Sequence, residues 1–266
     1  MATRLDTTLK ALKSQGKKAL IPYVMAGDSD PSVTVPLLHR MVEAGSDIIE
    51  VGLPFSDPMA DGPVIALAAE RALAAGTSTR GAIEMIKTFR RDNTHTPIVV
   101  MGYLNAIEIM GYDKFLALAK DAGVDGVLMV DLPPEEAGDF SAKLRAHDMN
   151  LIFLISPTTK PERTRAVLEA GSGYIYYVSL KGVTGSANIN IQEVSAKLSE
   201  LKTKTDLPIC VGFGIRDAES ASALASVSDG VIVGSALVKN FDNHPAEQAS
   251  DKIVDLLSQM RLAMDA

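Results

Sequence analysis

The sequence predicts an α/β fold, a single (β/α)8 barrel of the TIM-barrel class over residues 1–266. Three observations predict it. Short apolar runs recur eight times, their cores are almost continuously apolar, and segments with helical spacing that often end in Ala-Gly separate them. An open, doubly wound sheet is the alternative, and it is disfavoured because no G-x-G-x-x-G turn follows the first run.

The eight runs are typical of strands that are buried on both faces, as in parallel sheets. In chain order they cover residues 19–27, 46–52, 96–103, 126–132, 150–156, 173–179, 207–214 and 230–236. Eight parallel strands close around an interior that side chains fill, which favours a barrel over an open sheet.

Helical segments connect the runs, as parallel strands require. Segments such as 31–45, 113–123 and 163–171 end in a glycine, which is a common helix stop. Three further helices fall outside the plain repeat. They are an amphipathic helix within residues 1–16, a helix over 63–76 ahead of the usual one at 79–92, and a short piece at 235–240.

Composition excludes several classes of protein. The net charge of −7 argues against a nucleic-acid binder, and no apolar stretch approaches the roughly 18 residues of a membrane span. The single cysteine, Cys210, cannot form an internal disulfide and is expected to be a small buried apolar residue. Because the N-terminal segment also lacks an apolar core, we expect a cytoplasmic protein without an export signal.

Active sites of such barrels lie at the carboxyl ends of the strands, where two carboxylates stand out. Glu50 interrupts the apolar run at 46–52. If it faces inward, burial would raise its pKa toward neutrality, which suits a group that takes and gives a proton. Strand position alone leaves open that it faces the helices and pairs with a Lys or Arg. Asp61 follows in a loop, and on its own it is more typical of a turn or cap.

Glycine-rich loops follow the last three runs, at 181–185, 212–214 and 234–235. Glycine lets the backbone approach an anion closely, and a short helix beginning at Ser235 would direct N–H groups at it. Turn glycines without a ligand are the alternative, but three loops in register favour a phosphate site. The four histidines lie away from the strand ends, so no metal site is expected, and Lys181 is more typical of a solvated or phosphate-facing lysine than of a Schiff-base lysine.

From Tyr23 to Val238 the chain resembles the tryptophan synthase alpha subunit family. The matching segments, in order, are PYVMAGD, DIIEVGLPFSDPMADGPVI, MGYLN, GVLMVDLPPEE, ISPTT, YYVSLKGVTG, GFGI and GSALV. The segment that holds Glu50 and Asp61 is the most specific. The resemblance implies retro-aldol cleavage of indole-3-glycerol phosphate to indole and glyceraldehyde 3-phosphate, within tryptophan biosynthesis.

The resemblance also implies roles for individual residues. Glu50 would be the acid and base that takes the proton of the glycerol hydroxyl, and Asp61 would accept a hydrogen bond from the indole N–H. Thr184, in a lid over residues 180–190, would orient the aspartate. The implied phosphate cradle is Gly185, Gly214, Gly234 and Ser235, and the implied indole pocket is Tyr23, Met101, Leu128, Tyr176 and Phe213. Ala66 and Met25 depart from the family pattern. These departures are expected to affect the shape of the pocket and the contacts of the loop, and not the two carboxylates.

A partner is implied in the same way. The family's alpha subunit binds a beta subunit that carries pyridoxal phosphate, in an assembly of two alpha and two beta subunits, and this chain itself would hold no cofactor. The implied docking region is Pro54, Phe55, Asp57, Pro58, Met59, Asn105 and Pro133. Two other interpretations stay open: another phosphate-binding barrel such as a sugar-phosphate isomerase or epimerase, and a catalytically weak subunit that regulates a partner.

Overall fold

The computed structural model describes residues 2–179 and 190–266. Thr184, Gly185, Lys181 and nearly all of the expected lid therefore lie outside the described residues. The strands are β1 (Ala19–Met25), β2 (Ile49–Gly52), β3 (Ile98–Gly102), β4 (Gly126–Met129), β5 (Asn150–Leu151), β6 (Phe153–Ile155), β7 (Ile175–Val178), β8 (Ile209–Gly212) and β9 (Gly230–Val233). All neighbouring pairs are parallel, in the order β5-β4-β3-β2-β1-β9-β8-β7-β6.

The two outer members of this order, β5 and β6, are halves of one strand. They are separated only by Ile152, whose N–H donates to the carbonyl of Val127 at 2.9 Å. β5 pairs with β4, and β6 pairs with β7. One strand therefore joins both edges of the sheet, so the eight-stranded barrel is closed. This confirms the predicted fold class over the open sheet.

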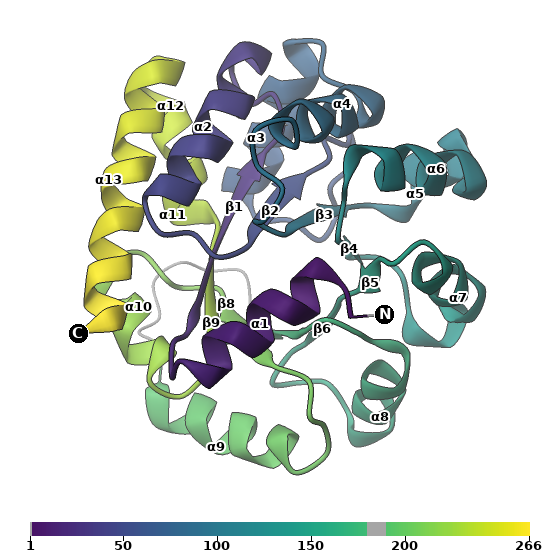
Figure 1. Ribbon diagram of the computed structural model, residues 1–266, viewed down its shortest axis with the longest axis vertical. Helices are drawn as coiled ribbons and strands as arrows, with labels where there is room; N and C mark the ends of the chain where they lie inside the picture. Colours follow the sequence, from purple (N-terminus) through teal and green to yellow (C-terminus); the bar gives the residue numbers. More distant parts are fainter. Residues whose placement is uncertain (1, 180–189) are drawn as a thin grey trace.

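Helices surround these strands, with α13 beside α2 and α10 (Figure 1). Their bounds are α1 (Arg4–Ser14), α2 (Pro31–Glu43), α3 (Pro63–Ala74), α4 (Thr79–Phe89), α5 (Leu104–Met110), α6 (Tyr112–Ala122), the 3-10 helix η1 (Pro134–Glu136), α7 (Gly138–Ala146), α8 (Pro161–Ala170), α9 (Ile191–Lys202), α10 (Ala218–Ala225), α11 (Ser235–Val238), α12 (Asn240–Asn243) and α13 (Ala246–Asp265). The expected extra helices are present as α1, α3 and the pair α11 and α12. Among the described helices, none combines the length and apolarity that crossing a bilayer requires.

Helix α1 closes the end of the barrel at which the strands begin. A capping box starts it: the Thr3 hydroxyl accepts from the N–H of Asp6, and the Asp6 carboxylate accepts from the N–H of Thr3, both at 3.0 Å. Leu5, Leu9 and Leu12 then fall on one face and join the inner core cluster. Cys210 belongs to the same cluster and is fully buried, as predicted.

Side chains of the strands alternate between this inner cluster and the outer cluster under the helices. On β2 and the residue before it, Ile48 packs in the inner cluster, whereas Ile49 and Val51 pack in the outer one. Glu50 has the same parity as Ile48. The strand therefore directs Glu50 into the barrel.

Candidate active site

Glu50 is completely buried inside the barrel. Its Oε1 accepts a hydrogen bond from the hydroxyl of Tyr174, and its Oε2 is buried without a hydrogen-bond partner. Burial raises the pKa of Glu50 to about 7, although the bond from Tyr174 lowers it. Near neutral pH the group is thus partly protonated and partly ionised. The alternative in which Glu50 faces the helices and pairs with a basic residue is wrong.

Two tyrosines, Tyr23 and Tyr176, lie near Glu50. Tyr23 packs against Gly52, the last residue of β2, and Tyr176 packs against Gly212, the last residue of β8. A Cβ added to Gly52 would lie 2.2 Å from the hydroxyl of Tyr23, and one added to Gly212 would lie 2.2 Å from the hydroxyl of Tyr176. A larger residue at either position would therefore require the neighbouring tyrosine to shift. Burial raises the pKa of both tyrosines, and the charges of Glu50 and of the loop aspartate act in the same direction. The two phenols therefore stay neutral.

Asp61 lies in the loop that leads from β2 to α3. Its Oδ2 accepts from the hydroxyl of Tyr103 at 3.1 Å, and the same hydroxyl accepts from the N–H of Ala60 at 2.9 Å. Tyr103 is held in turn by stacking on Phe55, with ring centroids 5.2 Å apart. Burial raises the pKa of Asp61, and the bond from Tyr103 opposes this. The N-cap of α3 is Gly62, without a side-chain bond, so the Asp61 carboxylate is not the helix cap.

The expected phosphate residues that the structure describes lie at the strand ends that form the mouth. Gly214 follows β8 with φ +79°, a conformation that favours glycine, and Phe213 beside it has φ +73°. The hydroxyl of Ser179 donates to the carbonyls of Gly212 and Phe213, at 2.9 and 2.7 Å, and ties the ends of β7 and β8 together. Gly234 follows β9 as the N-cap of α11, which begins at Ser235, so N–H groups of its first turn are available to an anion.

A cavity at the mouth contains only part of the expected indole pocket. It is lined by Tyr23, Met25, Leu53, Phe55, Pro58, Asp61, Ala69, Met101, Gly102, Tyr103 and Val130. Tyr23 and Met101 thus line the same cavity as Asp61. Leu128 is fully buried in the inner cluster, Tyr176 packs over Gly212, and Phe213 is 40% exposed, so these three do not line this cavity.

Exposed apolar side chains border this mouth. Met59, in the loop before α3, is 82% exposed, and Ile109, on α5, is 81% exposed. Asp57 and Asn105 are also exposed, and Pro133 lies just before η1. Asn105 lies within α5. The exposed members of the expected docking region therefore lie on the β2 loop and α5. Pro54 is buried, and Phe55 stacks on Tyr103 and lines the cavity, so the expectation that these two belong to an exposed surface is wrong.

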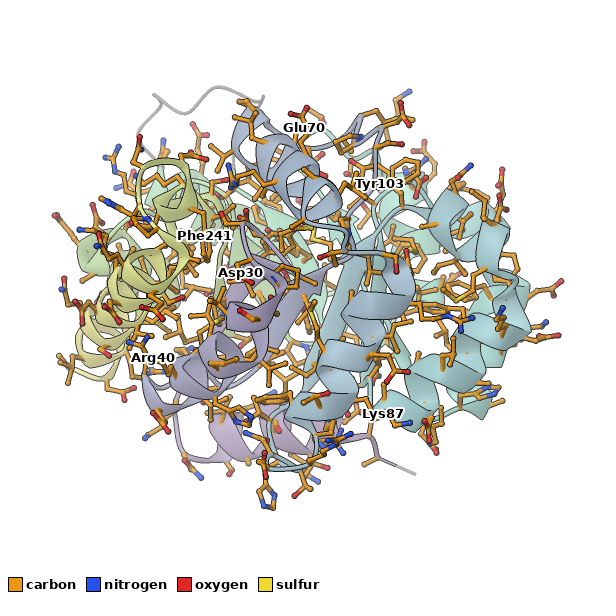
Figure 2. All side chains as sticks on the ribbon, turned by 90° about the horizontal axis from the view of Figure 1, so that it is seen from above. Asp30, Arg40, Glu70, Lys87, Tyr103 and Phe241 are labelled. Atoms are coloured by element: carbon orange, nitrogen blue, oxygen red, sulfur yellow. The ribbon has the colours of Figure 1, made fainter. Side chains whose placement is uncertain are left out.

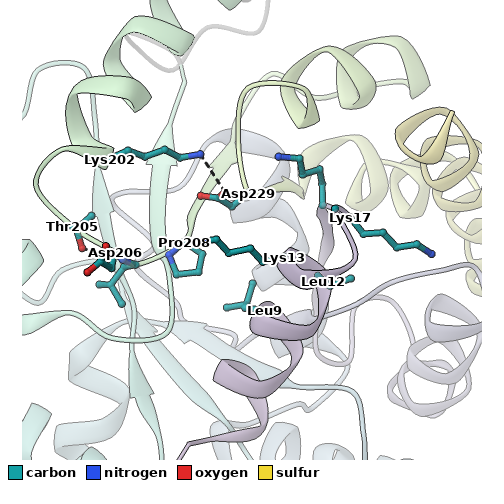
Figure 3. Close-up of a pocket in the computed structure, with 12 residues that line it drawn as sticks. Leu9, Leu12, Lys13, Lys17, Lys202, Thr205, Asp206, Pro208 and Asp229 are labelled. Atoms are coloured by element: carbon teal, nitrogen blue, oxygen red, sulfur yellow. Dashed lines mark hydrogen bonds and ion pairs between the residues drawn. The ribbon is translucent and has the colours of Figure 1, made fainter.

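A second cavity lies at the opposite end of the barrel, between α1 and the segment that leads into β8 (Figure 3). Lysines gather there, but two of them have partners. Lys202 pairs with Asp229 at 3.2 Å, and Lys18 donates to the carbonyl of Ser228 at 2.8 Å. The cavity is on the far side of the barrel from Asp61, so it is not the candidate active site.

Sequence reasoning misses the partner of Glu50. Tyr174 has the same parity as Tyr176, which would place it inside the barrel, but the sequence does not show which residue it faces. Tyr103 can be recognised at a strand end, but the sequence gives it no role. In residues 2–179 and 190–266, no group of three or more His, Cys, Asp or Glu side chains is placed to hold a metal ion.

Comparisons with known proteins agree over the whole chain. The family model described as tryptophan synthase alpha chain matches residues 9–265. A tryptophan synthase alpha chain of Psychrobacter arcticus is 59% identical over 270 residues, which covers 99% of this chain and 97% of the relative. One of Acinetobacter baumannii is 57% identical over 263 residues, with 99% and 98% coverage. The crystal structure of tryptophan synthase subunit alpha from Legionella pneumophila superposes with a TM-score of 0.90 at 44% identity, covering 100% of this chain and 99% of that one.

Proposed function

The chain belongs to the tryptophan synthase alpha chain family, and from this premise we propose that Glu50 and Asp61 carry out its reaction. Its activity is that of a lyase: indole-3-glycerol phosphate is cleaved to indole and glyceraldehyde 3-phosphate in tryptophan biosynthesis. The observation that supports the assignment most directly is the buried Glu50, with a pKa of about 7 and one oxygen without a partner.

Glu50 acts as base and then as acid. Its carboxylate takes the proton of the glycerol hydroxyl next to the bond that breaks and passes it to C3 of the indole ring, which regenerates the carboxylate. The carbon–carbon bond then cleaves: an electron pair of the deprotonated oxygen forms the carbonyl, and the bonding electrons return to the ring and leave neutral indole. A group with a pKa near the working pH is suited to both transfers. The Tyr174 bond to Oε1 leaves Oε2 available for the hydroxyl.

Asp61 stabilises the ring while it is protonated. Its carboxylate accepts a hydrogen bond from the indole N–H, and its negative charge lies beside the positive charge that develops on the ring. The hydrogen bond from Tyr103 fixes the side chain and favours the ionised form. The two carboxylates thus have different environments, one fully buried and the other at the cavity, which is how two acids take different roles.

The remaining site residues position the substrate. We assign the phosphate group to Gly214, Gly234 and Ser235, together with Gly185. Tyr23 and Met101 contact the indole ring beside Asp61, and Leu128, Tyr176 and Phe213 complete the pocket when substrate enters. Thr184 orients Asp61 from the loop after β7. The support is the shared location of the described members at one end of the barrel.

A beta subunit docks on the surface of the β2 loop and α5. What supports this is that Met59 on the β2 loop and Ile109 on α5 are both more than four-fifths exposed, and large exposed apolar side chains are candidates for contact with a partner. Structures of tryptophan synthase from Mycobacterium tuberculosis are among the similar proteins. Pyridoxal phosphate belongs to that partner in an assembly of two alpha and two beta subunits. The single buried cysteine suits a reducing cytoplasm.

The assignment is tested by indole release from indole-3-glycerol phosphate. Glu50→Gln and Asp61→Asn should each lower kcat by about 100- to 10,000-fold, the range for loss of a proton-transferring or charge-stabilising group. Glu70→Gln on α3 is the matched control, because Glu70 is exposed. Full activity in both site variants would refute the roles of the two carboxylates. Variants that lose indole release but still stimulate a beta subunit would separate catalysis from activation.

A further inference from the structure

One arginine joins three elements around the mouth of the barrel. Arg71 on α3 donates from Nε and Nη2 to the two oxygens of Asp28, at 2.6 and 2.9 Å. Its Nη1 also donates to the carboxylate of Asp242 on α12. Asp28 follows β1, so the guanidinium connects the first strand, the helix after the Asp61 loop, and the helix next to α11.

The Asp28 end of this connection is rigid. Asp28 is only 2% exposed, and burial raises its pKa while Arg71 opposes the shift. The preceding Gly27 donates to the Thr34 hydroxyl at 2.9 Å and has φ +75°. A Cβ on Gly27 would lie 1.8 Å from Thr77, which follows α3. The turn that carries Asp28 thus also packs closely against the residue that follows the end of α3.

Helix α3 also connects the two ends of the proposed substrate site. It begins at Pro63, two residues after Asp61. Its buried side chains are Ala68, Ala69 and Ala72, which pack in one cluster with Val238 of α11. The larger Val64 and Ile65 pack against this cluster only in the first turn, so the second half of the helix has small side chains and few interlocking contacts. The bidentate bond of Arg71 adds a directional restraint to this second half.

We propose that Arg71 is a positioning residue that fixes the span between Asp61 and the phosphate cradle at Ser235. The inference rests on the proposed function, in which one ligand is held by its ring at Asp61 and by its phosphate at Ser235. A ligand held at both ends reacts only if the span matches its length. A displacement of about 1 Å can lower the rate about 100-fold.

Arg71→Lys tests this, because lysine keeps the charge but cannot make the bidentate bond. We expect kcat/KM for indole-3-glycerol phosphate to fall about 10- to 100-fold. Ligands that use one end only, indole and glycerol 3-phosphate, should bind within about twofold of the original affinity by calorimetry, since neither needs the span. Asp242→Asn removes only the link to α12, and it should lower kcat/KM in the same way but by a smaller factor.

Arg40→Gln is the control. Arg40 pairs with Asp251 at 2.7 Å, and it lies away from the end of the molecule that carries Glu70 and Tyr103 (Figure 2). It should leave all three measurements unchanged. Thermal unfolding of each variant tests whether the chain is folded. If Arg71→Lys does not fold, the kcat/KM of Asp242→Asn tests the proposal in its place.

Two results would overturn the proposal. One is unchanged kcat/KM in Arg71→Lys, and the other is a loss of affinity for both fragments as large as the loss of kcat/KM, which indicates general damage. The proposed roles of the carboxylates are tested separately. Full activity in Glu50→Gln would refute the role of Glu50. The effect of Arg71→Lys on kcat/KM could still be compared with that of the Arg40→Gln control.

Discussion

Replacing Tyr174 with phenylalanine removes a single oxygen from the barrel interior, and we expect it to move the pH dependence of the reaction. The Tyr174 hydroxyl is the donor to Glu50 Oε1, and Oε2 has no partner. The variant therefore leaves a fully buried carboxylate without a hydrogen-bond donor. The ring remains, so packing in the inner cluster changes little.

The magnitude follows from the lost bond. A hydrogen bond to a charged group contributes about 1.5–3 kcal/mol, and about 1.4 kcal/mol corresponds to one pKa unit, so the shift is about one to two units. The bond lowers the pKa of Glu50, which is about 7, so its loss raises the pKa further. At pH 7 the ionised fraction then falls from about one half to about 1–10%, and the rate falls about 5- to 50-fold.

The assay is kcat for indole release between about pH 5.5 and 9.5, a range that brackets both pKa values. The original chain should show a rising limb near pH 7, and Tyr174→Phe should move this limb to higher pH and recover most activity near pH 9. Tyr177→Phe is the control, because Tyr177 packs in the outer cluster. A rate that falls equally at every pH, with the limb in place, would refute the link between Tyr174 and proton transfer.

Three further predictions concern stability and packing. The folded pKa of Glu50 is about 7 and exceeds its ordinary value of 4.5, so its contribution to the free energy of unfolding falls by about 3 kcal/mol as pH rises from about 4.5 to above 7. Glu50→Gln should remove this pH dependence, measured as the difference between the free energies of urea unfolding at pH 5 and pH 8.5. An unchanged difference would contradict the raised pKa. Gly52→Ala should cost about 1–3 kcal/mol because its Cβ meets the Tyr23 hydroxyl, and adding Tyr23→Phe should recover part of this in thermal unfolding. Leu5→Ala should lower the free energy of unfolding by about 2–5 kcal/mol, against about 0.5 or less for the exposed Lys10→Ala, and equal effects would show that α1 is not part of the core.

The strands could be predicted because each is buried on both faces and forms an apolar run without reference to its neighbours. Two features of the fold could not. The fifth strand breaks at Ile152, where pairing passes from β4 to β7, and this depends on how the barrel closes. Helix α5 is not predicted because its seven residues are too few for a helical spacing of apolar residues to be recognised.

The candidate site could be predicted only in part for a similar reason. Glu50 is conspicuous as an acid in an apolar strand, but its orientation depends on strand parity within the closed barrel. Its partner, Tyr174, is 124 positions away in the chain. Arg71 is 43 positions from Asp28 and 171 from Asp242, so nothing local indicates that the three meet. Pairings at such distances are set by topology and not by neighbouring residues.

The helix that closes the floor of the barrel has a consequence for synthesis on the ribosome. The Thr3 hydroxyl donates to Asn150 at 2.8 Å, across 147 positions of the chain. At a synthesis rate of about 5–20 residues per second, roughly 7 to 30 seconds pass between the synthesis of Thr3 and that of Asn150. During that interval the inner cluster lacks its members from Ile152 onward, so Leu5, Leu9 and Leu12 have only part of their core to enter. Docking of this first helix is therefore a late event in folding, although it precedes every strand in the chain.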